Sequence, residues 1–121
     1  MLAGKRVFIL EPEFLVALDM QRILEGAHIA TSLFARTVEE AHAFSERFAE
    51  FDLAILEMAE PTLSALALAR QFLTAGAALV FTSPDGQNPG PVLQGPPIVR
   101  KPFSDDDLLT ACVLALVTSS Q

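Results

Sequence analysis

The sequence predicts an α/β sandwich of three layers, in which a parallel five-stranded sheet lies between helices on both of its faces. Short apolar runs, typical of buried strands, alternate along the chain with longer segments of helical periodicity. Such alternation favours a parallel sheet with right-handed crossovers. The length of 121 residues suits a single domain that spans 1–121, with its core at about 4–117.

The first strand and helix are predicted within residues 7–26. Val7–Leu10 is an unbroken apolar run, and Pro12 suits the first turn of a helix, where its missing N–H is not needed. We expect this helix at about 12–25, with Gly26 ending it. Its apolar stripe is expected to consist of Leu15, Leu18, Ile23 and Leu24.

The middle of the chain predicts two further strands and two further helices. Residues 29–34 form a weaker strand, and Thr37 with Glu40 forms a capping box for a helix that runs to about 49. Residues 52–56 form a third buried strand, and a helix follows over 62–75. The inward residues of that helix are expected to be Leu63, Leu66, Ala69 and Leu73.

The last third of the chain is denser in proline and glycine. A fourth strand at 79–82 is followed by 83–97, which holds five prolines and three glycines. Because prolines at this density break helices, we expect the fourth helix to be shortened or absent. A fifth strand follows at 98–100, and a last helix begins at Ser104 and buries Cys112 on its apolar face. The strand order expected for such a chain is 2-1-3-4-5, which is flavodoxin-like.

Composition and charge limit the classes of function. The net charge of −7 and the pI of about 4.6 argue against nucleic acid and against an anionic membrane surface as partners. Hydrophobic residues make up 51% of the chain, which is enough for a packed core. A single cysteine excludes an intrachain disulfide, and no apolar run approaches the roughly 18 residues that a membrane helix needs. We therefore expect a cytoplasmic domain that lies outside the membrane.

Polar residues follow four of the buried strands. The carboxyl ends of parallel strands meet at one edge of a sheet, so these side chains are predicted to surround one crevice. Glu13 is either a further acid of that crevice or a solvated acid at the start of a helix. Ser83, at the end of the fourth strand, is either a functional group of that crevice or a hydrogen-bonded turn residue. In strand order, the four residues are Glu11, Glu57, Ser83 and Lys101.

Two short motifs carry a resemblance to a known family. Arg100-Lys101-Pro102-Phe103 places a Lys-Pro pair directly after the fifth strand, and Thr37-Val38-Glu39-Glu40-Ala41 opens the second helix. With the crevice residues, these motifs make the chain resemble the receiver domain of two-component response regulators (CheY-like), over about residues 4–117. The resemblance implies a cis Lys-Pro peptide, a role in phosphorelay signal transduction and no enzymatic activity.

In receivers, an aspartate after the third strand accepts the phosphoryl group, a hydroxyl after the fourth strand binds it and the lysine neutralises it. The resemblance assigns these places to Glu57, Ser83 and Lys101. Glu57 is one methylene longer than aspartate, which displaces its carboxylate by roughly 1.5 Å. A displacement of that size can cost about a hundredfold in a positioned reaction. The longer arm could instead pair with Lys101 and imitate a phosphorylated state. Ile98 stands where receivers often carry a switching aromatic residue.

The resemblance also implies a magnesium site, which this sequence supports poorly. Receivers hold Mg²⁺ with two adjacent acids after the first strand, the acceptor aspartate and a backbone carbonyl. Glu11 matches the first acid, but Pro12 occupies the place of the second and offers no oxygen. Glu57 and the carbonyl of Ala59 would complete the set. We expect Mg²⁺ to bind weakly or not at all, and we expect no other cofactor.

These departures predict a pseudo-receiver, a phosphorylation-independent signalling domain that acts through protein–protein interaction. Its expected partner is a histidine kinase, an output domain or another regulator, and a homodimer is also open. Two alternatives remain: a receiver that is still phosphorylated on Glu57 or another side chain, and a flavodoxin-like small-ligand binder or enzyme. A candidate interaction surface is an apolar patch beside the last helix, formed by Val92, Leu93 and Ile98.

Overall fold

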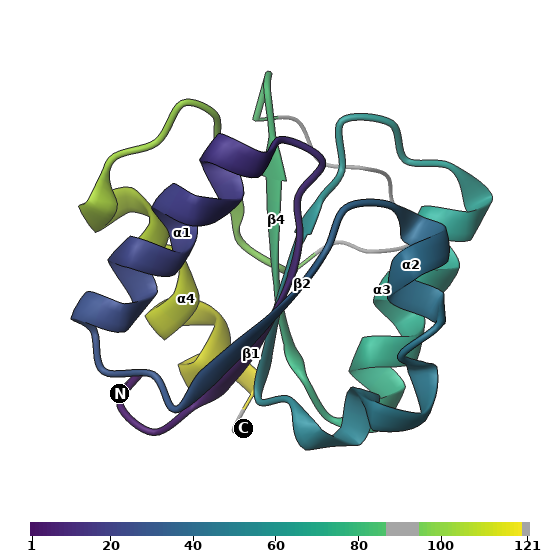
Figure 1. Ribbon diagram of the computed structural model, residues 1–121, viewed down its shortest axis with the longest axis horizontal. Helices are drawn as coiled ribbons and strands as arrows, with labels where there is room; N and C mark the ends of the chain where they lie inside the picture. Colours follow the sequence, from purple (N-terminus) through teal and green to yellow (C-terminus); the bar gives the residue numbers. More distant parts are fainter. Residues whose placement is uncertain (87–94, 120–121) are drawn as a thin grey trace.

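One parallel sheet organises the protein. The computed structural model describes residues 1–86 and 95–119. Its five strands lie in the order β2-β1-β3-β4-β5, with helices on both faces of the sheet (Figure 1), which confirms the predicted fold class. The prediction of a shortened or absent fourth helix concerns a segment of which 87–94 lies outside the described residues.

The strands begin and end close to the predicted positions. All neighbouring pairs are parallel, and Leu10 lies opposite Leu56 while Glu57 lies opposite Thr82, so the carboxyl ends of β1, β3 and β4 are level. The strands are β1 (Arg6–Leu10), β2 (Thr31–Ala35), β3 (Leu53–Glu57), β4 (Ala78–Ser83) and β5 (Ile98–Arg100).

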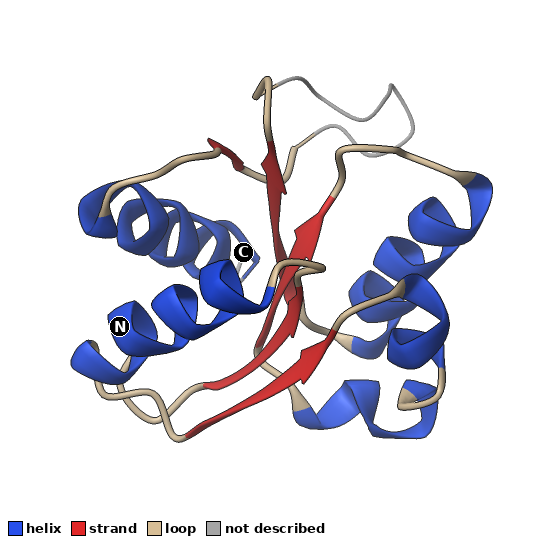
Figure 2. Cartoon of the chain, turned by 45° about the horizontal axis from the view of Figure 1, so that its top comes forward, coloured by secondary structure: helices blue, strands red, loops and turns tan. Residues whose placement is uncertain are grey.

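The helices form two layers that bury separate cores. Figures 1 and 2 show α1 and α4 on one face of the sheet, and α2 and α3 on the other. Alternate residues of β1 serve the two cores, because Val7 and Ile9 pack toward α1 and α4 while Phe8 and Leu10 pack toward the opposite layer. The helical segments are α1 (Phe14–Gly26), α2 (Val38–His42), the 3₁₀ helix η1 (Ser45–Glu50), α3 (Leu63–Ala75) and α4 (Asp105–Ser119).

Helix α1 starts later than predicted, and only half of its predicted apolar stripe is buried. The carboxylate of Glu11 accepts a hydrogen bond from the Glu13 amide at 3.0 Å, so the chain turns there and Pro12 precedes the helix. Leu15, predicted to lie inside, is 78% exposed, and Leu18 is also exposed. The buried face consists of Ala17, Met20, Ile23 and Leu24, so the prediction is confirmed for Ile23 and Leu24 and wrong for the two residues of the first turns.

The predicted helix that runs to residue 49 is divided in two. Thr37 caps α2 by accepting from the Glu40 amide at 3.1 Å, as predicted, but α2 ends at His42. The change to 3₁₀ geometry in η1 brings Phe48 against the ring of Phe8. Aromatic packing thus overrides the local helical pattern in this segment.

The predicted inward face of helix α3 is also correct only in part, because Ala69 is buried and Leu66 packs against the core. Leu63 is 87% exposed and Leu73 is exposed, although both were expected inside. Gly76 ends the helix in the left-handed region with φ of 101°. The buried face of α3 consists of Ala65, Leu68, Ala69 and Phe72.

Helix α4 closes the second core. Ser104 and Asp107 cap each other's backbone amides, with the Ser104 hydroxyl accepting at 3.1 Å and the Asp107 carboxylate at 3.4 Å. Cys112 is buried as predicted, and burial raises the pKa of its thiol to about 12, so the thiol stays protonated at neutral pH. In the described part of the chain, no helix has the length and apolar character needed to cross a membrane.

Only part of the predicted interaction patch can be compared with the structure. Val92 and Leu93 lie outside the described residues. Ile98 is half-buried in β5 and packs against the core on the α2 and α3 side, so it is a core contact more than a surface residue.

A core substitution tests this packing. Phe8→Ala is expected to lower the free energy of unfolding by about 3–5 kcal/mol, because the ring contacts those of Phe44, Phe48, Phe51 and Phe72. Leu63→Ala removes an exposed side chain and should change the free energy of unfolding by less than about 0.5 kcal/mol. Urea unfolding monitored by circular dichroism measures both, and equal effects would contradict the assignment of the core.

Candidate functional site

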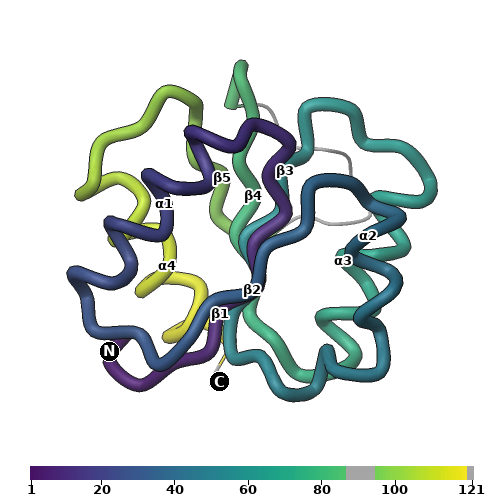
Figure 3. Tube along the Cα trace, in the orientation of Figure 1, coloured from purple at the N-terminus to yellow at the C-terminus, as the bar shows by residue number. Residues whose placement is uncertain are grey.

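The predicted crevice lies at the carboxyl end of the sheet. Figure 3 shows that the segments following β1, β3 and β4 leave the sheet at the same end of the molecule. The backbone fixes two of the site residues directly, because the Glu11 amide donates to the Ala35 carbonyl at 3.0 Å and the Lys101 amide donates to the Ser83 carbonyl at 2.9 Å. The strand ends therefore hold the site in place through the extension of the sheet ladder.

A buried ion pair occupies the centre of the site. The Lys101 ammonium donates to both carboxylate oxygens of Glu11, at 2.9 and 3.1 Å. The Glu11 side chain is fully buried, and the Lys101 side chain is only 14% exposed. The Glu13 amide adds a third hydrogen bond to the same carboxylate. Glu11 is thereby satisfied within the protein, and its charge is balanced by Lys101.

Glu57 does not make the ion pair with Lys101 that its longer arm suggested. One Glu57 oxygen accepts a hydrogen bond from the Ala59 amide at 3.1 Å, so the side chain folds back on its own loop. Lys101 pairs with Glu11 instead, because Glu11 accepts the ammonium with both oxygens. Burial raises the pKa of Glu57, and nearby Lys101 and the Ala59 amide offset part of this rise.

The Ser83 hydroxyl is engaged within its own turn. It donates to the Asp85 carboxylate at 2.9 Å and accepts from the Gly86 amide at 2.8 Å. Gly86 has a positive φ of 71°, which a glycine adopts without strain and which lets the amide turn toward Ser83. This arrangement is the hydrogen-bonded turn that the sequence left open as one of two possibilities.

One buried hydroxyl near the site was missed in the sequence. Thr82 is fully buried opposite Glu57 in the sheet, and its hydroxyl oxygen has no hydrogen-bond partner within residues 1–86 and 95–119. The available signal was the Thr82-Ser83 dipeptide, in which two hydroxyls end the same strand. Only the register of β4 against β3 shows which of them lies level with Glu57.

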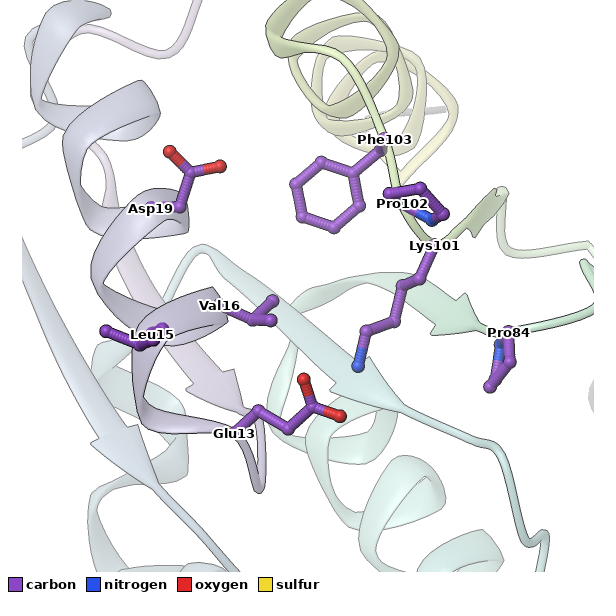
Figure 4. Close-up of a pocket in the computed structure, with 8 residues that line it drawn as sticks. All are labelled: Glu13, Leu15, Val16, Asp19, Pro84, Lys101, Pro102 and Phe103. Carbon is purple, nitrogen blue, oxygen red and sulfur yellow. The ribbon is translucent and has the colours of Figure 1, made fainter.

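Two hollows flank these residues. One, of about 460 Å³, lies between the start of α1 and the segment after β5. Figure 4 shows the Glu13 carboxylate and the Lys101 ammonium pointing toward each other in this hollow, with Val16 and Phe103 supplying apolar walls. The other hollow, of about 340 Å³, is lined by Glu57 and Pro12 among others.

The residues present do not fit the magnesium site that the resemblance implies. The oxygens of Glu11 already accept from the Lys101 ammonium, and Pro12 contributes an apolar ring where receivers have an acid. One oxygen of the Glu57 carboxylate already accepts a hydrogen bond from the Ala59 amide. Among the residues that the structure describes, no group of three or more His, Cys, Asp or Glu side chains could hold a metal ion. The donor set is thus short of the oxygen ligands that Mg²⁺ requires.

The topology of the sheet and the residues at the strand ends together match one known fold. A parallel 2-1-3-4-5 sheet with acids after β1 and β3, a hydroxyl after β4 and a cis Lys101-Pro102 peptide after β5 has the fold of a response-regulator receiver domain. The sequence matches no protein-family model and no curated protein.

Solved structures of that class resemble the chain over nearly its whole length. The N-terminal domain of a response regulator/sensory box/GGDEF protein from Carboxydothermus hydrogenoformans has a TM-score of 0.80 at 18% identity, covering 96% of this chain and 97% of that one. A response regulator receiver domain protein from Clostridium thermocellum has a TM-score of 0.76 at 21% identity, covering 96% of this chain and 97% of that one. The response regulator PhyR from Brucella abortus has a TM-score of 0.72 at 23% identity, covering 98% of this chain and 50% of that one. These similarities establish the receiver fold.

A double-mutant cycle tests the buried ion pair. Lys101→Met leaves the Glu11 carboxylate buried without its cation, and Glu11→Gln leaves Lys101 without its anion, so each should cost about 3 kcal/mol. The double variant should cost less than the sum by more than about 1 kcal/mol. The control is the same cycle at the exposed pair of Arg47 and Glu50, made with Arg47→Met, Glu50→Gln and the double variant. Its coupling free energy should be below about 1 kcal/mol. Urea unfolding measures all six variants, and additive costs at Glu11 and Lys101 would refute the pair.

The raised pKa of Glu57 predicts a pH dependence of stability. A carboxyl whose pKa is higher in the folded state binds its proton more tightly there, so its ionisation opposes folding. Wild-type stability relative to Glu57→Gln should therefore fall as pH rises above 4.5, the ordinary value, toward neutrality. Glu46→Gln, at an exposed glutamate, is the matched control for loss of one carboxylate. The prediction fails if wild type gains stability over Glu57→Gln across this range.

Proposed function

We propose that this protein is a pseudo-receiver: a non-enzymatic, cytoplasmic signalling domain that binds a protein partner without requiring a phosphoryl group. The observation that carries the proposal is the buried ion pair of Glu11 and Lys101. In receivers the lysine neutralises the phosphoryl oxygens. Here the ammonium is already held by both oxygens of a buried carboxylate, so a phosphoryl group would have to break that pair.

The remaining groups at the strand ends support the same proposal. Phosphoryl transfer places negative charge on three equatorial oxygens, and cations must stabilise them. The Ser83 hydroxyl is engaged by Asp85 and the Gly86 amide, and Glu13 adds a further carboxylate beside Lys101. A phosphoryl group would thus enter a site rich in carboxylates whose cation is already paired. We propose accordingly that Mg²⁺ binds weakly or not at all.

A surface next to the site supports a protein partner. The first turns of α1 expose three large apolar side chains, Phe14, Leu15 and Leu18. Adjacent exposed apolar residues of this size favour contact with another protein. Because α1 begins directly after Glu11 and Glu13, a partner bound to these side chains would lie beside the strand-end site. The partner class that we propose is a histidine kinase, an output domain or another regulator.

A phosphorylation assay tests the proposal. Incubation with acetyl phosphate and Mg²⁺ is expected to leave the intact mass unchanged, because the acceptor position is Glu57 and the lysine is paired. The double variant Pro12→Asp with Glu57→Asp restores the acceptor aspartate and the second acid of the metal site, so that Mg²⁺ can compete with Lys101 for the Glu11 carboxylate. This variant is the positive control and is expected to gain one phosphoryl adduct. An adduct on the wild-type protein that disappears in Glu57→Ala would favour a receiver that is still phosphorylated and would overturn the pseudo-receiver.

A further inference from the structure

The hollow between the start of α1 and the segment after β5, which we name the α1 hollow, has the size and lining of a small-ligand site. Its volume of about 460 Å³ lies within the roughly 300–1,000 Å³ common for such sites. Five of its eight lining side chains are apolar, and Val16 and Phe103 approach it from different elements (Figure 4). Both of these side chains also pack against the core, so they form walls that the core holds in place.

A carboxylate without a partner points into the α1 hollow. The Glu13 side chain is exposed, and in the described part of the chain it accepts no hydrogen bond and forms no ion pair. Its carboxylate is directed toward the Lys101 ammonium in Figure 4, but that ammonium donates to both oxygens of Glu11. Glu13 therefore keeps a negative charge that its own surroundings leave unpaired.

The part of the α1 hollow that lies further along α1 is acidic as well. Asp19 lines it and pairs with Arg22 at 2.8 Å. The same guanidinium pairs with Asp105 at 3.0 Å, so one cation serves two carboxylates. With Glu13 and the pair of Glu11 and Lys101, four carboxylates surround two cations, which leaves two negative charges in excess. The field of these charges attracts cations into the hollow and repels anions.

We propose that the α1 hollow binds a small amphipathic organic cation, with its ammonium or guanidinium group at Glu13 and its apolar body between Val16 and Phe103. Hydrogen bonds between a cationic N–H and a carboxylate are stronger than neutral ones. The Phe103 ring packs well against a second aromatic frame and also attracts positive charge to its face. The proposal involves no phosphoryl chemistry, and it goes beyond the proposed function.

Other occupants fit the α1 hollow less well. A divalent metal ion prefers about six or more oxygen ligands, and the described residues contain no group of three or more side chains that could hold one. An acidic molecule would meet the excess negative charge. A neutral apolar molecule would cover Glu13 and remove water from its carboxylate without replacing the lost hydrogen bonds. Apolar walls beside an unpaired carboxylate thus select a molecule that is both apolar and cationic.

The exposure of Glu13 predicts a modest affinity that salt weakens. For 2-phenylethylamine, a probe with one ring and one ammonium group, a dissociation constant of about 1 mM is expected from its small size. Raising the ionic strength from about 0.01 to 0.15 M shortens the screening length from about 30 to 8 Å, so the constant should rise. Binding driven by apolar contact alone would not weaken with salt.

Four probes that differ in one feature test the ligand class. In low salt at neutral pH, 2-phenylethylamine is titrated against 2-phenylethanol, which is neutral, phenylacetate, which is an anion, and propylamine, which lacks the ring. Amide shifts in ¹⁵N-labelled protein should saturate for 2-phenylethylamine, at residues 13–19 and 101–103, and the other probes should bind about tenfold more weakly or worse. Equal binding of 2-phenylethanol or phenylacetate, shifts centred elsewhere or no saturation would overturn the proposal.

Substitutions test the residues of the α1 hollow. Glu13→Gln keeps the shape of an exposed, unpaired side chain, so the fold should be unchanged and the affinity for 2-phenylethylamine should fall about tenfold. Phe103→Leu keeps an apolar wall without the ring and should weaken binding about threefold. Glu46→Gln removes an exposed carboxylate on η1 and is the matched control, with no expected effect. Circular dichroism and urea unfolding check that each variant is folded.

The Glu13 variant decides the outcome. Binding to Glu13→Gln that equals binding to the wild type, or equal weakening by Glu46→Gln, would contradict a cation site at Glu13. None of these titrations contains a phosphoryl donor or Mg²⁺. Failure of this proposal and failure of the pseudo-receiver are therefore distinguishable.

Discussion

The ion pair of Glu11 and Lys101 is the constraint on which the strand-end site depends. Removing a carboxylate and an ammonium from water is costly, and the cost is offset only when geometry and further hydrogen bonds satisfy both groups. Here three hydrogen bonds reach the Glu11 carboxylate, and the backbones of both residues extend the sheet ladder. The pair thereby joins the end of β1 to the end of β5 across the carboxyl edge of the sheet. With the lysine held by Glu11, Glu57 and Ser83 take partners in their own loops, the Ala59 amide for Glu57 and Asp85 with the Gly86 amide for Ser83.

This arrangement accounts for a receiver fold whose strand-end groups are satisfied within the chain. Glu57 turns to the Ala59 amide and Ser83 to its own turn, so these two side chains have partners nearby in the sequence, whereas Glu11 is satisfied by Lys101. The fold still places an acid, a hydroxyl and a lysine at one edge, since the parallel sheet aligns the carboxyl ends of its strands. The fold can be retained while the chemistry of the site changes, because the sheet is held by its two apolar cores and not by the polar side chains at this edge.

The local sequence pattern is sufficient to predict some elements of this fold and insufficient for others. The central strands were predictable because β1, β3 and β4 are buried on both faces and therefore appear as continuous apolar runs. The Thr37 cap was predictable because it rests on bonds between residues three apart. The inward faces of α1 and α3 were predictable only in part, since Leu15 and Leu63 have the apolar character of core residues and yet lie outside. Which apolar side of such a helix meets the sheet depends on residues far away in the chain.

The sequence by itself determined the parallel sheet, its strand order and the set of residues that meet at its carboxyl edge. These depend on hydrophobic runs and on the geometry of parallel strands, both of which are local or general. Only the tertiary structure decided that Lys101 pairs with Glu11 and not with Glu57, and that Thr82 lies level with Glu57. It also decided that one side of α4 stays exposed. The physical reason is that pairing and burial depend on distances between residues up to 90 positions apart, which no local pattern contains.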